Sequence, residues 1–375
     1  MRVLVTGSDG FVGRNLCVRL RELPHFEVIC IDRTSSESDL SNGLTNCDFV
    51  FHLAGVNRPP EPSEFMVGNR DLTARLARTL AARGGSIPVV FTSSAQADRD
   101  NPYGLSKRAA EQELLQALPN TDRLVHVFRL PNIFGKWCRP NYNSAVATFC
   151  YNIARGLPIT INDPAAKVNL VYIDDVVDAF LGILESHRDG RSIGGGPFRD
   201  VRPVYPVTVG EVAAAIEYFH KARHEISIDS VGVGFLRCLY ATYLSYLPTA
   251  DFSYQITRHV DPRGAFAEVL RTRDSGQISF FTAHPGVTRG GHYHHTKNEK
   301  FLVVSGHARF GFQHVITGET HSITTTGDCP TVVDTVPGWA HDITNIGNDE
   351  LIVLLWANEV FDRERPDTVT HQVKL

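Results

Sequence analysis

The chain has 375 residues, of which 42% are hydrophobic and 21% charged, and its formal net charge is -4 at pH 7. This length exceeds what one ordinary hydrophobic core organises, so we expect two to three domains. The small net charge and the scattered Lys and Arg residues leave no electrostatic footprint for nucleic acid or for an anionic membrane surface. We therefore expect neither as a partner.

The sequence predicts no targeting or membrane segment. No apolar run approaches the ~20 residues that cross a bilayer, and the N-terminal segment 1–7 is typical of a first strand rather than of a signal peptide. The seven cysteines are odd in number and widely spaced, and none forms a C-x-x-C pair. This usage favours a reduced, cytoplasmic setting.

The first part of the chain alternates apolar strands with helices. Strands are expected at 2–6, 26–32, 47–55, 87–95 and 124–135, and helices at 11–23, 68–84 and 106–118. Residues 33–47 are polar and leave room for little more than one helix. Because apolar strands that alternate with helices form parallel sheets, we predict an α/β fold with a Rossmann-type doubly wound parallel sheet.

The pattern changes twice after this sheet. Between about 136 and 243, helical stretches such as 146–156 and 209–223 alternate with irregular segments, which predicts a substrate subdomain. From about 251 helical periodicity ends, and short strand-like runs alternate with Gly, Asp and Asn turns, as in an all-β barrel or sandwich. We therefore place one domain at 1–243 and an all-β domain at 251–375.

Three glycines separate the first expected strand from the first expected helix. Gly7, Gly10 and Gly13 form G-x-x-G-x-x-G, with Phe11 and Val12 between the last two. The first glycine allows a tight turn and the second lets the backbone approach a pyrophosphate at the helix N-terminus. The third lets the helix pack closely on the strand. The arrangement predicts a dinucleotide-binding turn made of these five residues.

Two residues bear on the choice of nicotinamide cofactor. Asp32 ends the second expected strand, where an acidic side chain holds an adenosine ribose and favours NAD. Arg33 follows directly and can pair with a 2′-phosphate, which favours NADP. A solvated surface charge is the alternative interpretation of Arg33, so these residues leave the choice between NADH and NADPH open.

A tyrosine and a lysine form the candidate hydride-transfer site. Tyr103 and Lys107 stand in Y-x-x-x-K, and a spacing of four puts both side chains on one face of a helix. We expect the ammonium to lower the pKa of the phenol, so that Tyr103 passes a proton to or from a carbonyl oxygen. Ser94, at the end of an expected strand, is placed to hydrogen-bond the same oxygen.

These motifs together resemble the extended short-chain dehydrogenase/reductases that act on nucleotide-activated sugars, through the segments TGSDGFVG, HLAG, FTSSA, YGLSK and RLPNIFG. The resemblance implies that Ser94, Tyr103 and Lys107 are the catalytic triad and that Tyr103 and Lys107 also bind the cofactor. It further implies a cofactor-lining loop after the fourth strand, here Leu53, Ala54 and Gly55. Only nine positions separate Ser94 from Tyr103, fewer than in most members, so a different sugar face stays open.

Three histidines and a glutamate in the last third of the chain are candidate metal ligands. His292 and His294 form H-x-H, and side chains two apart on a strand point to the same side. Glu299 follows five residues after His294, and His341 comes from a later expected strand. Three imidazoles and one carboxylate suit Zn, Fe, Mn or Ni.

The same residues fall into two motifs that resemble the cupin family. The first, G-x5-H-x-H-x4-E-x6-G, fits every position from Gly286 to Gly306. The second, G-x2-H-x3-N, fits Gly338, His341 and Asn345, with Pro337 directly beside the glycine. The resemblance implies a cupin barrel that holds one divalent metal, with zinc as the expected ion. Many cupins have lost the metal, so a barrel without one stays an alternative.

The whole chain resembles the CapF-type enzymes of bacterial capsule and O-antigen biosynthesis, notably in the segments 136–156, 242–254 and 294–306. That resemblance implies a UDP-activated 4-keto amino sugar, UDP-2-acetamido-2,6-dideoxy-β-L-arabino-hexos-4-ulose, as substrate. The cupin would invert C3, and the reductase domain would then reduce the C4 ketone with NADPH rather than NADH. The product would be UDP-2-acetamido-2,6-dideoxy-β-L-talose, on the route to UDP-N-acetyl-L-fucosamine. A homodimer through the cupin is also implied.

Several points stay open at this level. The residue that moves the C3 proton is open among Lys297, His295 and Tyr293, and the cations that bind the diphosphate are open among Arg139, Lys136 and Arg155. A single-site reductase with a structural cupin is one alternative function. A non-enzymatic sensor of sugar nucleotides or NADP is another, although binding alone needs no tuned phenol such as Tyr103.

Overall fold

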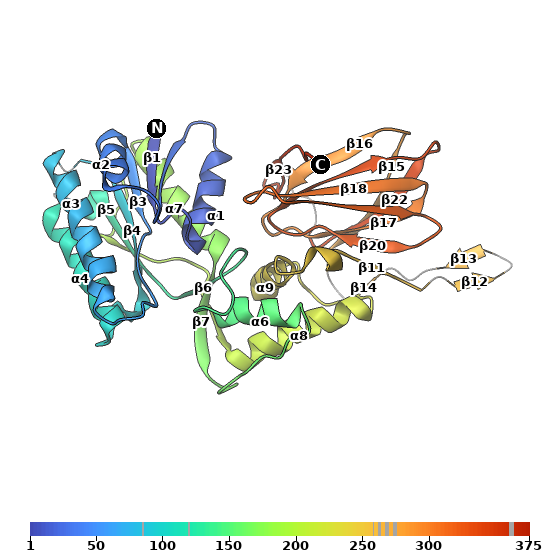
Figure 1. Ribbon diagram of the computed structural model, residues 1–375, viewed down its shortest axis with the longest axis horizontal. Helices are drawn as coiled ribbons and strands as arrows, with labels where there is room; N and C mark the ends of the chain where they lie inside the picture. The colour runs from blue at the N-terminus through green and yellow to red at the C-terminus, as the bar shows by residue number, and fades with distance from the viewer. Residues whose placement is uncertain are drawn as a thin grey trace. The chain divides into compact units, whose positions relative to one another are not determined.

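The structure is a computed structural model of the whole chain and describes residues 1–84, 86–118, 121–257, 259–261, 264–266, 270–272, 276–359 and 364–375. The chain divides into two units (Figure 1). The first unit comprises Met1–Trp137 with Val168–Pro206, and the second comprises Cys138–Lys167 with Val207–Leu375. Both units are therefore made of two segments of the chain.

The first unit is built on a six-stranded sheet with the strand order β2-β1-β3-β4-β5-β8, and the pairs along it are parallel. Its strands are β1 (Arg2–Thr6), β2 (Glu27–Ile31), β3 (Phe49–His52), β4 (Val89–Ser94), β5 (Val125–Leu130) and β8 (Phe198–Arg199). Its main helices are α1 (Phe11–Arg21), α2 (Glu37–Asn46), α3 (Leu72–Ala82), α4 (Pro102–Ala117) and α7 (Ile173–Arg188). This confirms the predicted Rossmann-type parallel sheet.

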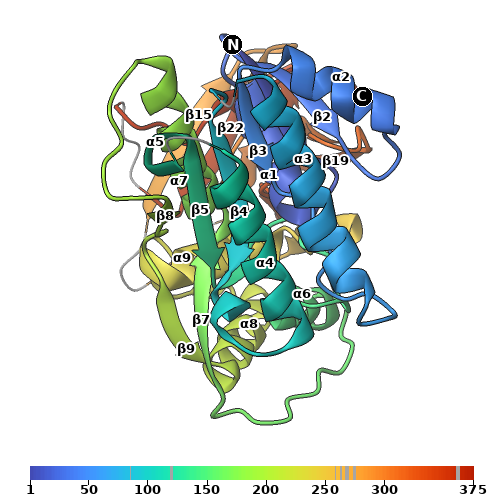
Figure 2. The same ribbon diagram turned by 90° about the vertical axis from the view of Figure 1, so that its left-hand side faces the viewer.

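Helices cover both faces of this sheet. Figure 2 shows α3 and α4 side by side over one face, and α1 and α7 lie on the other face (Figure 1). Shorter elements complete the unit, namely η1 (Met66–Asp71), η2 (Ala95–Asp98) and α5 (Thr121–Leu124). A separate three-stranded sheet has the order β6-β7-β9 and comprises β6 (Asn132–Phe134), β7 (Lys167–Tyr172) and β9 (Tyr205–Thr208).

Successive residues of the central strands point to opposite faces, because a strand alternates its side chains. Val50 and Phe91 belong to a buried apolar cluster that includes residues of α2, α3 and α4. On the other face Phe51 and Phe128 pack around Phe180 of α7, with ring centroids 5.8 and 4.9 Å away. Burial on both faces explains why these strands read as continuous apolar runs.

The strand before the loop Leu53–Gly55 has a different number in this chain than in the family that the sequence resembles. The segment 33–47 contains α2 and no strand, as its polar composition indicates. The loop Leu53–Gly55 therefore follows the third strand of this chain, β3, which takes the place of the family's fourth strand. The implied cofactor-lining loop keeps its place at the carboxyl edge of the sheet, because β3 pairs directly with β1.

The second unit consists of helices and two five-stranded antiparallel sheets, which confirms the predicted all-β cupin fold of the C-terminal part. The sheets have the orders β11-β20-β17-β22-β15 and β19-β18-β21-β16-β23. The helices are α6 (Ala145–Ile153), α8 (Val209–His224), α9 (Gly234–Leu244) and η3 (Thr249–Asp251). No helix in the described part of the chain is long and apolar enough to span a bilayer.

The strands of this unit are short and alternate with turns. The first sheet contains β11 (Ser253–Gln255), β15 (Gln277–Ala283), β17 (Glu299–Ser305), β20 (Thr331–Asp334) and β22 (Leu351–Ala357). The second contains β16 (Thr288–Tyr293), β18 (His307–His314), β19 (Thr320–Thr326), β21 (Trp339–Asn345) and β23 (Val369–Thr370). Two further pairs join β10 (Ser227–Ile228) to β14 (Arg271–Thr272) and β12 (His259–Asp261) to β13 (Gly264–Phe266).

The division into units differs from the expected limits 1–243 and 251–375, because α6, α8 and α9 group with the barrel. A buried charge cluster contributes to this grouping. Arg223 of α8 pairs with Asp334 of β20, and Lys300 of β17 lies 2.5 Å from the other oxygen of Asp334. All three side chains are buried. The expected limits, with the substrate subdomain at 136–243, stay a prediction.

Candidate functional site

The glycine turn lies at the carboxyl edge of the parallel sheet, where the strand order reverses around β1. Gly7 has a φ of +69°, and a Cβ there would lie 2.8 Å from the backbone of Ala54. A Cβ on Gly13 would lie 2.1 Å from the carbonyl oxygen of Gly7, so only glycine permits this packing. Gly10 precedes α1 without a side-chain cap. The first N–H groups of the helix, from Phe11 onward, are thereby left for an anion.

The end of β2 is preorganised by hydrogen bonds. Asp32 accepts hydrogen bonds through Oδ1 from the backbone N–H of Thr34 at 2.8 Å and from its hydroxyl at 2.7 Å. These bonds lower the pKa of the Asp32 carboxyl. Arg33 is exposed. The structure thus presents one ionised acid and one exposed guanidinium at the position where an adenosine ribose would lie.

The loop after β3 is fixed against β1. Leu53 and Ala54 donate their backbone N–H groups to the carbonyl and hydroxyl oxygens of Thr6, each at 3.2 Å. A Cβ on Gly55 would lie 2.7 Å from Asn69 Oδ1 and 3.0 Å from Lys107 Nζ. The absence of a side chain at Gly55 therefore lets the loop lie directly against the lysine.

The three residues expected to carry hydride-transfer chemistry lie together at this edge. Ser94 is the last residue of β4, and Tyr103 and Lys107 lie one turn apart near the start of α4. A hydrogen bond joins Tyr103 to Ser94. Lys107 is buried and donates from Nζ to the carbonyl oxygen of Thr92, 3.0 Å away.

The predicted effect of Lys107 on the phenol is wrong for this structure. Burial raises the pKa of Tyr103, and the hydrogen bond with Ser94 opposes that rise only in part. Burial also lowers the pKa of Lys107 to about 8, while the charge of Glu111 acts to raise it. The lysine is still predominantly protonated at neutral pH, and its ammonium is held by Thr92 and not by the phenol.

Two supporting residues were not predicted from the sequence. Asn69 of η1 holds both backbone groups of Val56, at 2.8 and 2.9 Å, and donates to Ser106 Oγ at 2.9 Å. Buried Glu111 pairs with Arg129 at 2.7 Å. Glu111 stands four residues after Lys107 on α4, so helical spacing would have found it. The neighbourhood of Asn69 has no such signal.

The three cations considered for a diphosphate have other contacts in the structure. Lys136 is only 1% exposed and forms an ion pair with Asp174 at 2.7 Å. Arg155 donates to the carbonyl oxygen of Tyr246 at 2.9 Å. The guanidinium of Arg139 lies 5.2 Å from the ring centre of Tyr142. The burial and pairing of Lys136 argue against its proposed role.

The second unit brings together the four expected metal ligands. Their candidate ligand atoms, from His292, His294, Glu299 and His341, all lie within 4.8 Å of one another. His292 lies on β16 directly opposite His341 of β21, with ring centroids 4.7 Å apart. Glu299 opens β17. Two motifs that are far apart in the sequence therefore meet because β16 and β21 are paired strands.

The electrostatics of this group fit a divalent cation. Burial lowers the pKa of His292 to about 3 and also lowers that of His341, so both imidazoles are neutral and keep a lone pair. Burial alone would raise the pKa of Glu299, but His294 and His341 hold it well below its usual range. His341 Nε2 is buried and makes no hydrogen bond within the described residues. An unsatisfied buried nitrogen beside an ionised carboxylate is what a metal ion would complete.

The three candidates for the C3 proton occupy different environments. Lys297 Nζ lies 2.8 Å from Glu299 Oε1, on the oxygen that does not face the histidines. The rings of Tyr293 and His295 pack against each other with centroids 5.5 Å apart. Lys297 is therefore in contact with the carboxylate of a metal-ligand candidate.

Comparisons with known proteins agree with both halves of this architecture. Residues 3–194 match the NAD dependent epimerase/dehydratase family, and residues 259–369 match the polysaccharide biosynthesis C-terminal domain. The UDP-2-acetamido-2,6-beta-L-arabino-hexul-4-ose reductase of Pseudomonas aeruginosa is 54% identical over 368 residues, which cover 98% of each chain.

Two solved structures are similar to this chain over its full length. The capsular polysaccharide assembling protein CapF from Staphylococcus aureus is 40% identical, with 100% of both chains covered and a TM-score of 0.67. A structure of CapF with the inhibitor 3-isopropenyl-tropolone is 35% identical at the same coverage, with a TM-score of 0.61. The chain therefore belongs to the CapF-type family of capsular polysaccharide biosynthesis proteins, which join an NAD dependent epimerase/dehydratase domain to a polysaccharide biosynthesis C-terminal domain.

Proposed function

We propose that this chain is a bifunctional sugar-nucleotide enzyme with two consecutive steps on one ketone. The barrel inverts C3 of UDP-2-acetamido-2,6-dideoxy-β-L-arabino-hexos-4-ulose, and the parallel-sheet domain then reduces C4 to give UDP-2-acetamido-2,6-dideoxy-β-L-talose. One observation carries the proposal: a His292–His294–Glu299–His341 group, buried at all but the half-buried His292, and a Ser94–Tyr103–Lys107 group occur in the same chain. The name of the Pseudomonas relative supports the substrate class.

The reductive step follows from the groups at the carboxyl edge of the sheet. NADPH supplies the hydride. Tyr103, with a raised pKa, holds its proton at neutral pH and delivers it to the C4 oxygen as that oxygen gains negative charge. Ser94 positions the same oxygen through its hydroxyl, and the positive charge of Lys107 favours the developing alkoxide and binds the nicotinamide ribose. A ketone, a hydride and a proton balance to an alcohol.

The proposed preference for NADPH uses Asp32 and Arg33. Asp32 Oδ1 is already engaged by Thr34, which leaves this acid less free to hold a ribose hydroxyl. Arg33 is exposed beside it, where a guanidinium can pair with a 2′-phosphate. NADH lacks that phosphate and gains nothing from the arginine.

The epimerising step follows from the acidity of C3, which is next to the ketone. His292, His294, Glu299 and His341 would hold one divalent metal, proposed to be zinc, and the ion would supply a Lewis acid for the ketone oxygen. Neutral imidazoles and an ionised carboxylate give the required ligand states. Inversion requires loss of the C3 proton from one face and its return from the other.

The proposal includes a cytoplasmic protein that forms a homodimer through its barrel. The seven cysteines all lie among the described residues and none of them forms a disulfide, which supports a reducing compartment. The UDP-activated 4-keto amino sugar is the proposed partner of both sites.

Product analysis tests the proposal. The purified chain is incubated with the 4-keto sugar nucleotide and NADPH, and the configuration of the product at C3 and C4 is read by NMR. The proposal predicts an alcohol at C4 and an inverted C3. A product reduced at C4 with the original configuration at C3 would contradict the proposed epimerisation. An unchanged ketone would contradict both proposed activities.

A single-site reductase is the second candidate function, because the name of the Pseudomonas relative gives a reductase only. In that case the barrel would be structural. His292→Ala separates the two functions: the bifunctional enzyme loses C3 inversion in this variant, whereas a single-site reductase gives the same product as the wild type.

A further inference from the structure

The C-terminal segment lies along β16, the strand that carries the metal-ligand candidate His292 and ends one residue before His294. β23 pairs antiparallel with β16, with Thr370 opposite His292 and Val369 opposite Tyr293. His371 donates its backbone N–H to the carbonyl oxygen of Gly291 at 2.8 Å. The tail thus adds an edge strand to the sheet at the level of the candidate metal site.

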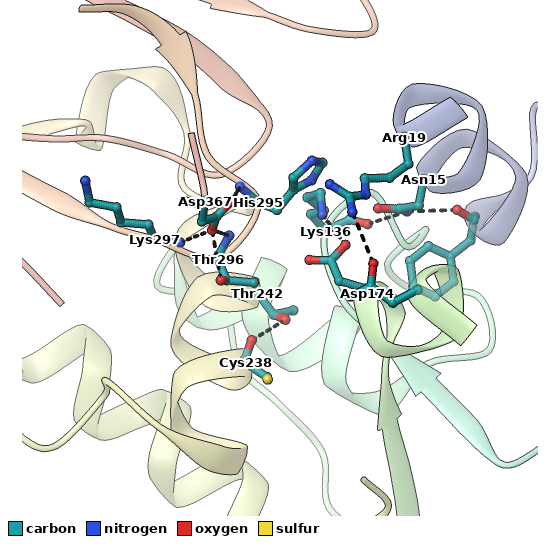
Figure 3. Close-up of polar contacts among 12 residues, drawn as sticks. Asn15, Arg19, Lys136, Asp174, Cys238, Thr242, His295, Thr296, Lys297 and Asp367 are labelled. Carbon is teal, nitrogen blue, oxygen red and sulfur yellow. Dashed lines mark hydrogen bonds and ion pairs between the residues drawn. The ribbon is translucent and has the colours of Figure 1, made fainter. Parts of the chain in front are cut away.

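Asp367, just before β23, holds the loop between His294 and Glu299. Its carboxylate accepts backbone N–H groups from three successive residues, His295 at 2.8 Å, Thr296 at 2.6 Å and Lys297 at 2.7 Å. It also accepts the hydroxyl of Thr296 at 2.9 Å. Figure 3 shows the side chain of Asp367 directed at this loop. Burial would raise the pKa of Asp367, but the charge of His295 and these N–H groups keep it well below the usual range.

The main chain of the same residue contacts a ligand candidate directly. The carbonyl oxygen of Asp367 is hydrogen-bonded to His294 Nδ1. A carbonyl oxygen only accepts, so Nδ1 carries the hydrogen in this contact. His294 Nε2 is then the nitrogen that faces the ligand group, 3.1 Å from Glu299 Oε2. Partners of this kind fix the ring orientation and tautomer of metal-binding histidines.

We propose that Asp367 is a positioning residue of the metal site, which orients His294 through its carbonyl group and fixes the spacing of His294 and Glu299 through its carboxylate. This inference rests on the proposed metal function of the four residues. It extends the site beyond the two cupin motifs to the C-terminal tail. Its consequence is that metal affinity depends on a carboxylate that does not touch the metal.

Other contacts hold the same loop from different sides, so loss of the Asp367 carboxylate should not unfold the barrel. Arg237 of α9 donates to Thr296 Oγ1 and lies 3.2 Å from Glu359. Asn298 donates its backbone N–H to Asn358 Oδ1 at 2.9 Å. The carboxylate of Asp367 is thus one of several attachments, and it is the one closest in sequence to β23 and its pairing with His292.

Cobalt binding tests the inference without any activity measurement. The apo full-length chain is titrated with Co²⁺, and the visible absorption of the bound ion reports affinity and ligand geometry. Asp367→Asn keeps the size of the side chain and removes its charge. We expect roughly 10- to 100-fold weaker Co²⁺ binding and an altered absorption band, as for other outer partners of metal-bound histidines.

Two variants give the controls. Asp349→Asn removes one negative charge from an exposed residue of the same barrel and should bind Co²⁺ as the wild type does. His341→Ala removes a ligand and should abolish the band. If the wild type and His341→Ala give the same weak signal, the proposed metal site itself is wrong. If His341→Ala loses the band while Asp367→Asn keeps the wild-type affinity and spectrum, only the role of Asp367 is wrong.

A milder variant covers the case in which Asp367→Asn does not fold, as judged by circular dichroism. Thr296→Val removes the hydroxyl that donates to Asp367 and accepts from Arg237, and it leaves the three backbone N–H groups in place. We expect about 10-fold weaker Co²⁺ binding, the lower end of outer-partner effects. Wild-type affinity in a folded Thr296→Val protein would then overturn the inference.

Discussion

The parallel sheet and the barrel build their sites in different ways. In the sheet, the site forms where strands end: the turn at Gly7 and the loop at Gly55 follow β1 and β3, and Ser94 is the last residue of β4 in the same parallel set. In the barrel, the metal-ligand candidates come from the strands themselves and from the loop between β16 and β17. A topological edge thus creates the first site, whereas the pairing of β16 with β21 creates the second.

The two sites also treat buried charge differently. Lys107 is a buried cation whose ammonium is held by one carbonyl oxygen, and burial lowers its pKa to about 8. Glu299 is a buried anion among His294, His341 and Lys297, and its pKa is held well below the usual range. The first site is therefore poised to change its protonation near neutral pH, whereas the second keeps a fixed charge suited to a metal.

Loss of the Tyr103 phenol should give the largest decrease in the reductase activity of the sheet domain and should leave the C3 exchange activity of the barrel unchanged. Tyr103→Phe removes the proton donor, so NADPH oxidation with the 4-keto sugar nucleotide should fall by about 10²- to 10⁴-fold. Exchange of the C3 proton with D₂O, followed by NMR without NADPH, should continue at the wild-type rate. Normal turnover in this variant would contradict the role of the phenol.

Loss of His341 should have the opposite effect and abolish the C3 exchange activity of the barrel. His341→Ala removes a proposed ligand whose Nε2 is buried beside Glu299, so metal content measured by elemental analysis should be lost and C3 exchange should stop. NADPH oxidation with an already inverted ketone should persist, since the sheet residues are untouched. Full metal occupancy in the variant would overturn the ligand assignment.

The buried charge cluster of Arg223, Asp334 and Lys300 should affect the stability of the second unit and not its catalytic activity. Arg223→Met leaves buried Asp334 with Lys300 as its remaining ionic partner in this cluster, and we expect the free energy of unfolding of the second unit to fall by about 3 kcal/mol in chemical denaturation. Lys221→Met is the matched control on the same helix, because its pair with Glu225 is exposed. Its effect should stay below about 1 kcal/mol. Equal effects of the two changes would mean that Arg223 does not tie α8 to the barrel.

The pH dependence of the reduction should report the pKa of the buried Lys107 ammonium. Because the folded-state pKa of Lys107 is about 8, below its ordinary value of 10.5, the ammonium is lost as pH rises through about 8, and kcat/KM should fall there. Glu111→Gln removes the charge that raises this pKa, so the descending limb should move to lower pH. Glu113→Gln, two residues further on α4, should leave it in place. An unshifted limb in Glu111→Gln would exclude the coupling.

The smallest expected effect concerns the cofactor. Arg33→Ala should raise KM for NADPH by about 10-fold, the worth of one charged hydrogen bond, and leave KM for NADH unchanged. Steady-state kinetics with both cofactors measure this. Equal changes for NADPH and NADH would show that Arg33 does not read the 2′-phosphate.

Local pattern predicts most of the sheet. β1 occupies the expected 2–6, the glycine turn follows it, and Tyr103 and Lys107 lie on one helix. These features depend on neighbours in sequence, so strand composition and helical spacing reveal them. The four metal-ligand candidates also come together, because two recognisable motifs lie on paired strands.

Burial and distant contacts account for what the pattern did not predict. The raised pKa of Tyr103 and the internal pairing of Lys136 depend on how deeply each side chain lies, which periodicity does not measure. Asp367 reaches His295 across 72 positions, and Asn69 reaches Ser106 across 37. Such contacts depend on chain topology, and no short sequence motif predicts them.

The isotope content of the product tests the central claim most directly. The wild-type chain is given the 4-keto sugar nucleotide and unlabelled NADPH in D₂O, and the isolated product is examined by NMR. The account predicts deuterium at C3, from the solvent-exchanged step in the barrel, and protium at C4, from the hydride of NADPH. A product with protium at C3 would contradict it.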